Sequence, residues 1–363
     1  MKRSSNTPAA LGYRMPAEWE PHAATWIAWP HHRSDWPGKF GAIPWVYAGI
    51  VRHLARVERV AIIAEDAMAR NRALQILVDS GVNTEALDWY LWPTNRGWTR
   101  DCGPIFITSE SRDREPIAIT NWRFNAWAKY PDWQKDETIA GRVARRLRLP
   151  EWRPSVSLNG RPQRVVLEGG SIDVNGRGTM LTTEECLLSS TQQRNPGVTR
   201  AELERIFFDY LGIRSVIWLG SGIAGDDTHG HVDDIARFVV PDSVVACVET
   251  DDSDPNHEPL AENLRRLRIA RDQHGAALRV VELPMPHPII FRGQRLPASY
   301  SNFYIANRLV LVPTFNDRND RRALEILQGL FPDREVIGIH CGDLVWGLGT
   351  LHCMTQQQPA VAN

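Results

Sequence analysis

The sequence predicts an α/β fold, and three observations support this class. Segments with the apolar spacing of helices alternate along the chain with short apolar runs typical of strands. This alternation recurs about five times, roughly every 50–70 residues, without sequence identity between the passes. Each pass ends with polar or reactive side chains at the same position within its unit. With 363 residues the chain can bury a large core.

The first half of the chain contains two such passes, preceded by residues 1–15, which we expect to form a loose arm. Expected strands cover 24–29, 60–63, 87–92 and 165–167. Expected helices cover 45–57, 66–80 and 136–147, and Gly81 ends the second of them.

The second half begins with a capping box, Thr199-Arg200-Ala201-Glu202, whose side chains can satisfy the free N–H groups of a helix start. Gly212 is placed to end this helix. A strand at 215–219, a helix at 259–273, a strand at 278–283, a helix at 320–330 and a strand at 335–339 follow. The pattern therefore predicts one repeated architecture over residues 1–363, in a single catalytic domain.

Five of the expected strands begin with polar or reactive residues. They are Asp101, Glu168, His231 with Asp233, Asn302 and Cys353. If the five units form a ring, these side chains meet at its axis. The alternative is an ordinary open α/β sheet, in which such alternation is commonplace. We favour the ring, because every unit ends in the same kind of residue.

The composition excludes several classes of function. The formal net charge is −1 and 23% of the residues are charged, so no basic excess indicates nucleic-acid binding. No apolar run reaches membrane-spanning length, and no signal-peptide pattern follows Met1. The cysteine count is odd, without a CxxC pair, which disfavours a disulfide framework and a zinc ribbon. We expect a cytoplasmic protein. The cysteines are Cys102, Cys186, Cys247, Cys341 and Cys353.

Cys353 is the candidate reactive group. It follows a glycine-spaced approach, 347–349, and precedes an uncharged Thr-Gln-Gln run. An inert core thiol is the alternative, because free cysteine is among the most buried residue types. A nucleophilic thiolate needs a base, and His231 is the candidate.

The acidic residues around this thiol indicate the substrate. Carboxylates raise a thiol's pKa, so they make sense beside Cys353 only if the substrate is a cation. Carboxylate pairs match the fork of a guanidinium, and we expect Asp101 and Asp233 to clamp one. Cys353 would then attack its central carbon, and His231 would give a proton to the departing ammonia. Water would release a ureido product.

Other polar and aromatic residues have competing interpretations. His229, His231 and Asp233 would share one face of a strand, which suits a metal or a cleft equally. We favour no metal, because a metal leaves the thiol unexplained. His352 would point to the opposite face and pack. Glu168 either caps the Gly169-Gly170 bend or serves the site.

Two tryptophans are candidates for contact with the substrate. Trp98 and Trp127 lie in loop-like contexts beside Asn and Arg, as expected for walls that stack on a flat cation. Cys102 is expected to be structural.

The motifs resemble the agmatine deiminases of the Porphyromonas-type peptidylarginine deiminase family, within the guanidino-modifying pentein superfamily. The resemblance covers nearly the whole chain: 15–19, 98–104, 124–127, 167–171, 230–233, 302–304 and 339–359. It implies a fivefold pseudo-symmetric α/β propeller and catalysis by Cys353, His231, Asp101 and Asp233. Glu168 and Asn302 would be supporting polar groups, with no metal and no organic cofactor. Typical members convert agmatine to N-carbamoylputrescine, a step towards putrescine.

The sequence departs from that family pattern at four positions. Leu348 and Thr350 replace a glycine and an asparagine before the nucleophile, Cys102 stands where threonine is usual, and Ala128 where glycine is usual. A deiminase of free or peptidyl arginine, an amidinotransferase and a silent guanidine-binding protein therefore remain alternatives. The expected partner is a small cationic guanidino compound, and a homo-oligomer is compatible with the sequence.

Overall fold

A computed structural model describes residues 6–111 and 113–361 as a mixed α/β fold with five sheets of three or four strands. The first sheet has the order β20-β1-β2-β3, so a strand from the end of the chain, β20, pairs with a strand from its beginning, β1. The bounds are β1 His22–Ala28, β2 Arg59–Ala64, β3 Leu87–Leu91 and β20 Thr355–Pro359.

The other four sheets have three strands each and share one connectivity. The first strand pairs antiparallel with the second, and the third pairs parallel with the second. They comprise β4 Ile105–Thr108, β5 Ile117–Thr120 and β6 Glu151–Trp152; β9 Asp173–Val174, β10 Thr179–Thr183 and β11 Ser215–Leu219; β12 Ala236–Val240, β13 Ser243–Val248 and β14 Arg279–Pro284; β17 Tyr304–Ile305, β18 Leu309–Thr314 and β19 Glu335–His340.

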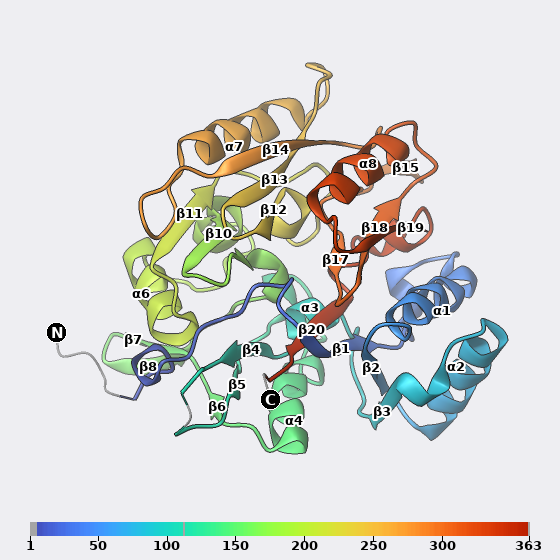
Figure 1. Cartoon of the computed structure of the whole chain (residues 1–363), viewed down its shortest axis with the longest axis horizontal. Coiled ribbons are helices and arrows are strands. Elements are labelled where there is room, and N and C mark those ends of the chain that lie inside the picture. The colour runs from blue at the N-terminus through green and yellow to red at the C-terminus, as the bar shows by residue number, and fades with distance from the viewer. Residues whose placement is uncertain (1–5, 112, 362–363) are drawn as a thin grey trace.

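Helices connect the parallel strands, as parallel pairing requires a long crossover. They are α1 Ile43–Leu54, α2 Ala67–Asp79, α4 Ile139–Leu147, α5 Glu184–Leu188, α6 Arg200–Leu211, α7 His257–Ile269 and α8 Asp320–Leu330. Figure 1 shows the sheets one after another around the middle of the view, with most of these helices outside them and α3 (Thr99–Cys102) and β20 near the centre. Two short hairpins, β7–β8 (Ser155–Leu158, Arg161–Arg164) and β15–β16 (Ile290–Phe291, Gln294–Arg295), are additions to this scheme.

Local sequence signals explain where several helices begin and end. The predicted capping box is confirmed: the Thr199 hydroxyl accepts from the Glu202 N–H while the Glu202 side chain accepts from the Thr199 N–H. Gly212 ends α6 in the left-handed conformation, at φ 74°. Asp66 caps α2 by accepting from the Ala69 N–H at 2.7 Å.

Two expectations about secondary structure were wrong. Residues 165–167 form no strand; Val166 makes only an isolated bridge to Arg123. β5 pairs instead with β6. The chain reaches β6 after α4 ends at Arg148 in the left-handed conformation, and Leu149, which precedes Pro150, is biased towards extended backbone. The middle strand of each three-stranded sheet, such as β10, was also missing from the sequence pattern.

The N-terminal arm is also tighter than expected over its described part. Tyr13 and Met15 are buried, and the Arg14 and Met15 N–H groups donate to Thr108 and Leu211 carbonyls at 2.9 Å. Residues 1–5 lie outside the described part of the chain.

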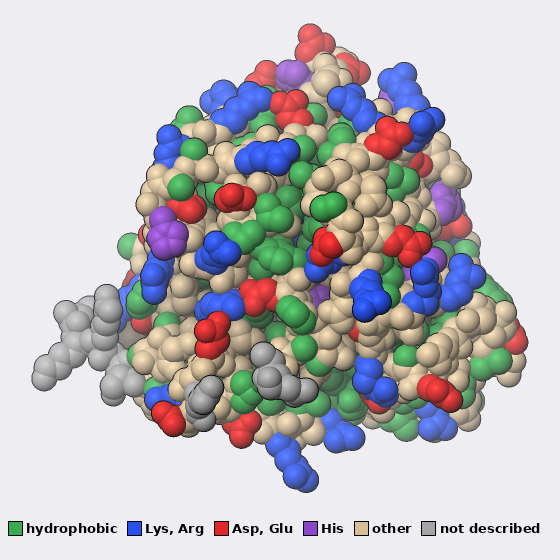
Figure 2. Space-filling view, in the orientation of Figure 1, with side chains coloured by type: hydrophobic (Ala, Val, Ile, Leu, Met, Phe, Trp, Pro, Cys, Tyr) green, Lys and Arg blue, Asp and Glu red, His purple; other side chains and the backbone are tan. Residues whose placement is uncertain are grey.

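The molecular surface carries both signs of charge. Figure 2 shows Lys and Arg interspersed with Asp and Glu over the visible face. Among the described residues, no helix combines the length and apolar character needed to cross a membrane.

Candidate active site

The polar residues expected at strand starts come together in the structure, but they lie in short turns before the strands. Asp101 is in α3, Glu168 precedes the single turn 169–171, and His231 and Asp233 lie at the turn 232–234. One or two residues separate each of these turns from the first strand of a three-stranded sheet. The expectation that they begin strands was wrong by a few residues, while their convergence is observed.

The Cys353 thiol lies among polar groups at the centre. It is 5% exposed, and its Sγ lies 3.1 Å from Asn302 Nδ2 and 3.8 Å from Asp233 Oδ2. Burial raises the pKa of this thiol well above its usual value, and the carboxylates of Asp233, Asp234 and Asp101 raise it further. In the empty site the sulfur therefore keeps its proton.

His231 is fully buried between three carboxylates. Its Nδ1 lies 3.9 Å from Asp101 Oδ1 and 4.0 Å from Asp233 Oδ1, and its Nε2 lies 3.7 Å from Glu168 Oε2. Burial lowers the pKa of the imidazole, but Asp101 and Glu168 outweigh it and hold the pKa well above its usual value. His231 thus begins as an imidazolium, a proton donor.

Glu168 does not line the pocket, and its Oε2 lies beside the Nε2 of His231. Its other oxygen, Oε1, accepts from Arg194 Nε at 3.1 Å, and both side chains are fully buried. Burial raises the pKa of Glu168, and Arg194 then brings it down to about 2. Arg194 belongs to no sequence motif; only the fold brings this loop residue beside Glu168.

Asp101 is oriented by two donors. Trp127 Nε1 donates to its Oδ2 at 2.9 Å, and the Gly170 N–H donates to its Oδ1 at 3.1 Å. A Cβ at position 170 would lie 2.5 Å from His231 Nδ1 and 2.9 Å from Asp101 Oδ1, so only glycine fits there. Burial raises the pKa of Asp101 to about 6.

Asp233 is fully buried, with one oxygen that is hydrogen-bonded and one that has no partner among the described residues. His352 Nδ1 lies 2.6 Å from Oδ2, whereas Oδ1 has no hydrogen-bond partner in the described part of the chain. Burial raises the pKa of Asp233, but the bond from His352 outweighs it, and the pKa lies below its usual value. The expectation that His352 packs on the opposite face was wrong, because residues 351–354 form a turn and not a strand.

Asn302 joins the nucleophile loop to the rest of the site. Its Oδ1 accepts from Thr350 Oγ1 at 2.8 Å and from the His352 N–H at 3.0 Å. Its Nδ2 donates to Asp234 Oδ1 at 3.0 Å and to the Cys353 sulfur. Thr350, a departure from the family pattern, therefore contributes to the hydrogen bonding that fixes this loop.

A pocket leads from the surface to the thiol. Trp98 and Trp127, the two predicted walls, line it together with Asp101, Leu348 and Cys353. Its remaining lining residues are Ser34, Asp35, Arg96, Tyr130, Asp227, Thr228, Gly347 and Gly349. A Cβ on Gly349 would lie 2.9 Å from the Trp98 ring and 3.2 Å from the Cys353 sulfur, so glycine lets the loop pass between wall and nucleophile.

The arrangement of His229 differs from the one expected. It adopts φ 65°, its Nε2 lies 3.2 Å from Ser189 Oγ, and its Nδ1 lies 3.7 Å from Glu185. It therefore does not share a face with His231 and Asp233. A different trio, Glu168, Cys186 and His231, has ligand atoms within 4.8 Å of one another. Arg194 already neutralises Glu168 there, and a metal ion would have to compete with that guanidinium.

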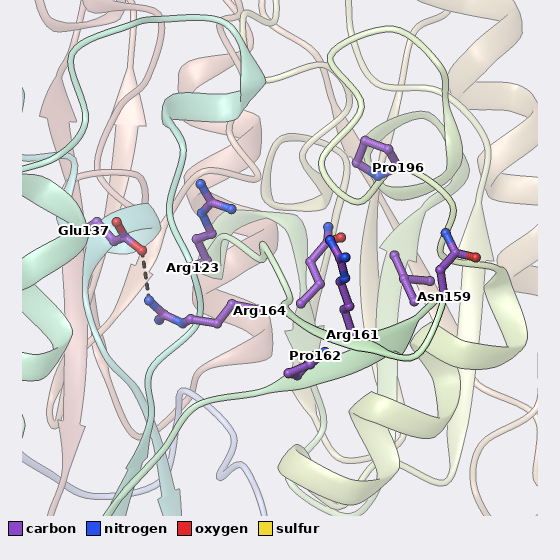
Figure 3. Close-up of a pocket in the computed structure, with 9 residues that line it drawn as sticks. Arg123, Glu137, Asn159, Arg161, Pro162, Arg164 and Pro196 are labelled. Carbon is purple, nitrogen blue, oxygen red and sulfur yellow. Dashed lines mark hydrogen bonds and ion pairs between the residues drawn. The ribbon is translucent and has the colours of Figure 1, made fainter.

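A second pocket, near the hairpin β7–β8, lies apart from this site (Figure 3). Arg164 pairs with Glu137 at 2.9 Å within it. Its lining residues include Arg123, Arg161, Pro162 and Asn159, without a nucleophile. We assign it no chemistry.

Comparison with known proteins identifies the family of the chain. Residues 14–359 match the family model described as Porphyromonas-type peptidyl-arginine deiminase. The chain is 36% identical to agmatine deiminases of Pseudomonas aeruginosa and Medicago truncatula, over 99% of this chain and 99% and 100% of theirs. It also superposes on the agmatine deiminase of Enterococcus faecalis with a TM-score of 0.86 and 32% identity, over 99% of both chains. The chain therefore belongs to the Porphyromonas-type peptidyl-arginine deiminase family.

Proposed function

We propose that this protein is a hydrolase that deiminates agmatine to N-carbamoylputrescine and ammonia. The observation that carries the proposal is the thiol of Cys353 beside two buried carboxylates, Asp101 and Asp233, at the end of a tryptophan-walled pocket. Full-length relatives named agmatine deiminase support the same substrate. The product is one that a further hydrolysis converts to putrescine.

Binding is the first task of the site. The guanidinium lies between Trp98 and Trp127, and its N–H groups donate to Asp101 and to the open Oδ1 of Asp233. This places its central carbon about 3–3.5 Å from the Cys353 sulfur, a distance suited to attack. The arriving cation lowers the pKa of the thiol, which loses its proton to bulk water as the substrate enters. The sulfur regains a proton from the hydroxyl of the final intermediate when the C–S bond breaks.

In the chemical steps Cys353 is the nucleophile and His231 transfers the protons. The thiolate adds to the guanidinium carbon, and the His231 imidazolium donates its proton to the nitrogen that leaves as ammonia. A thiouronium on Cys353 remains. Neutral His231 next takes a proton from water, whose oxygen attacks the same carbon, and the C–S bond breaks. Urea-type product and free thiol result, and no oxidant or reductant is needed.

Product analysis tests the proposal. We expect ammonia and N-carbamoylputrescine from agmatine in equal amounts, with much lower kcat/KM for free arginine and for a peptide with a C-terminal arginine. Citrulline formation from either arginine substrate at a higher kcat/KM would overturn the choice of agmatine. Transfer of the amidino group to an added amine, without ammonia, would indicate an amidinotransferase. Agmatine binding without product would indicate a silent binding protein.

We further infer that the five sheets are the blades of a fivefold α/β propeller in one catalytic domain. The repeated antiparallel-then-parallel connectivity supports this, as does the pairing of β20 with β1, which joins the end of the chain to its beginning. A cytoplasmic location, a homo-oligomer and the lack of a nucleic-acid partner stay predictions.

A further inference from the structure

A buried ion pair that the proposed reaction does not use joins the N-terminal segment to the residue before the nucleophile. His352 Nδ1 lies 2.6 Å from Asp233 Oδ2, and its Nε2 lies 2.8 Å from Glu18 Oε2. His352 thus bridges the carboxylates of Asp233 and Glu18 through its two ring nitrogens, and it is adjacent to Cys353 in the chain.

Glu18 is itself held in place by cations and a backbone donor. Arg100 Nη2 donates to its Oε2 at 3.0 Å, the Ile305 N–H donates to its Oε1 at 2.8 Å, and Arg237 Nη2 lies 3.0 Å from Oε1. Burial raises the pKa of Glu18, but Arg237, His352 and Arg100 outweigh it and hold the pKa well below its usual value. Glu18 therefore gives His352 a fixed, negatively charged anchor.

We propose that Glu18 and His352 are a positioning pair that holds Asp233 through its Oδ2 and leaves its Oδ1 for the substrate. His352 engages Oδ2, and the second oxygen of Asp233 is the one without a partner among the described residues. Glu18, His352 and Asp233 all lie behind the residues that line the pocket, but Asp233 is the one of the three beside the Cys353 sulfur, at 3.8 Å, so Glu18 and His352 act through it. The inference rests on the proposed function, in which Asp233 is half of the guanidinium clamp.

The competing explanation is structural: the pair would only tie the N-terminal segment to the centre. The two explanations predict a different dependence of the Cys353 reaction rate on the charge of the reagent. A structural defect slows every reaction of Cys353 alike. A misdirected or protonated Asp233 slows the reaction with a cation and spares the reaction with a neutral molecule of the same shape.

Alkylation of Cys353 by 2-chloroacetamidine, a cation, and 2-chloroacetamide, its neutral counterpart, measures this difference without turnover. In His352→Asn the side-chain amide stands where Nδ1 stood and can still donate to Asp233. In His352→Gln it stands nearer the Nε2 position, facing Glu18, and leaves Asp233 unpaired. We expect the ratio of cation to neutral rates to fall roughly 10- to 100-fold in His352→Gln, by analogy with the loss of hydrogen-bond partners that orient metal ligands. His352→Asn should fall less, and Glu18→Gln should lie between it and the wild type.

His257 supplies a control histidine away from this pair, because its Nδ1 lies 2.9 Å from the Glu249 carbonyl oxygen. His257→Gln should lower thermal stability yet keep the wild-type ratio. An unchanged ratio in His352→Gln, or equal losses in His352→Asn and His352→Gln, would overturn the positioning pair. If agmatine proved not to be the substrate, the ratio would still report on the pair, because alkylation requires only a reactive thiol and a cation site.

Discussion

The inner end of the pocket and its mouth are built differently. At the inner end, Asp101, Asp233 and His231 are almost fully buried, and hydrogen bonds or buried charges fix each of them. At the mouth, Asp35 and Asp227 are each paired with a cation of the chain, Arg96 and Lys129.

This contrast separates two tasks. The buried groups present a fixed set of charges that suits any guanidinium, because they cannot rearrange without leaving a charge unpaired. At the mouth, Asp227 can exchange Lys129 for a group at the far end of the substrate at little cost, because Lys129 is 40% exposed, whereas Asp35 is buried against Arg96 and keeps its partner. The inner end thus sets the reaction, and the mouth selects the substrate.

Removing the nucleophile should have the largest effect. Cys353→Ala should lower kcat for agmatine by on the order of 10⁶-fold, the scale for loss of a covalent nucleophile. Because the carboxylates remain, agmatine should still raise the melting temperature of the variant. A residual rate within about tenfold of the wild type would show that the sulfur is not the attacking atom.

Neutralising one arm of the clamp should come next. Asp101→Asn should cost about 2–4 kcal/mol in transition-state binding, or roughly 30- to 1000-fold in kcat/KM, as for the loss of a buried charged partner. The wild-type kcat/KM should fall as pH drops below about 6, where the carboxyl of Asp101 takes up its proton. A flat profile down to pH 5 would contradict the raised pKa.

The same substitution should stabilise the fold. The folded pKa of Asp101, about 6, exceeds its usual 3.8, so the folded state binds more protons between these values. Stability therefore falls as pH rises through this window, and the ionised group costs up to ~3 kcal/mol at pH 7. Asp101→Asn should remove that cost in urea unfolding at pH 7 and show no gain below pH 4. Equal stability at both pH values would contradict the assignment.

The two ends also differ in how far the sequence predicts them. The residues at the inner end could be predicted because each has a chemically distinctive side chain at the same position of a repeated unit. Helices α6 and α8 could be predicted from local capping and apolar spacing. Arg194 and Glu18 were not assigned to the site, because their contacts join segments far apart in the chain. The turn at 351–354, which redirects His352, also depends on Asn302 and has no local signal.

A substitution at the mouth should weaken the recognition of the far end of the substrate only. Asp227 lines the pocket, and Tyr130 donates to its Oδ2 at 2.7 Å. Asp227→Asn should raise KM for agmatine by roughly fivefold, about 1 kcal/mol, with kcat nearly unchanged. Butylguanidine, which lacks the far-end ammonium, is the control and should show the same kcat/KM with both proteins. Equal losses on both substrates would place Asp227 in folding and not in recognition.

Leu348 should give the smallest change, because two effects oppose each other there. It lines the pocket and adopts φ 67°, ψ 25°, a left-handed conformation that costs a leucine about 1–2 kcal/mol. Leu348→Gly removes this strain but also removes apolar contacts. In addition, the larger conformational entropy of glycine stabilises the unfolded state by about 0.5–1 kcal/mol.

We therefore expect Leu348→Gly to change the free energy of unfolding by less than about 1 kcal/mol, whereas Leu351→Gly, at a fully buried position nearby, should cost at least 2–5 kcal/mol. Because the leucine narrows the mouth, its removal should raise the kcat/KM of arginine relative to agmatine, since arginine carries a carboxylate branch at its far end. An unchanged ratio would show that the mouth selects by charge alone, and Asp227 with Lys129 would then carry the discrimination.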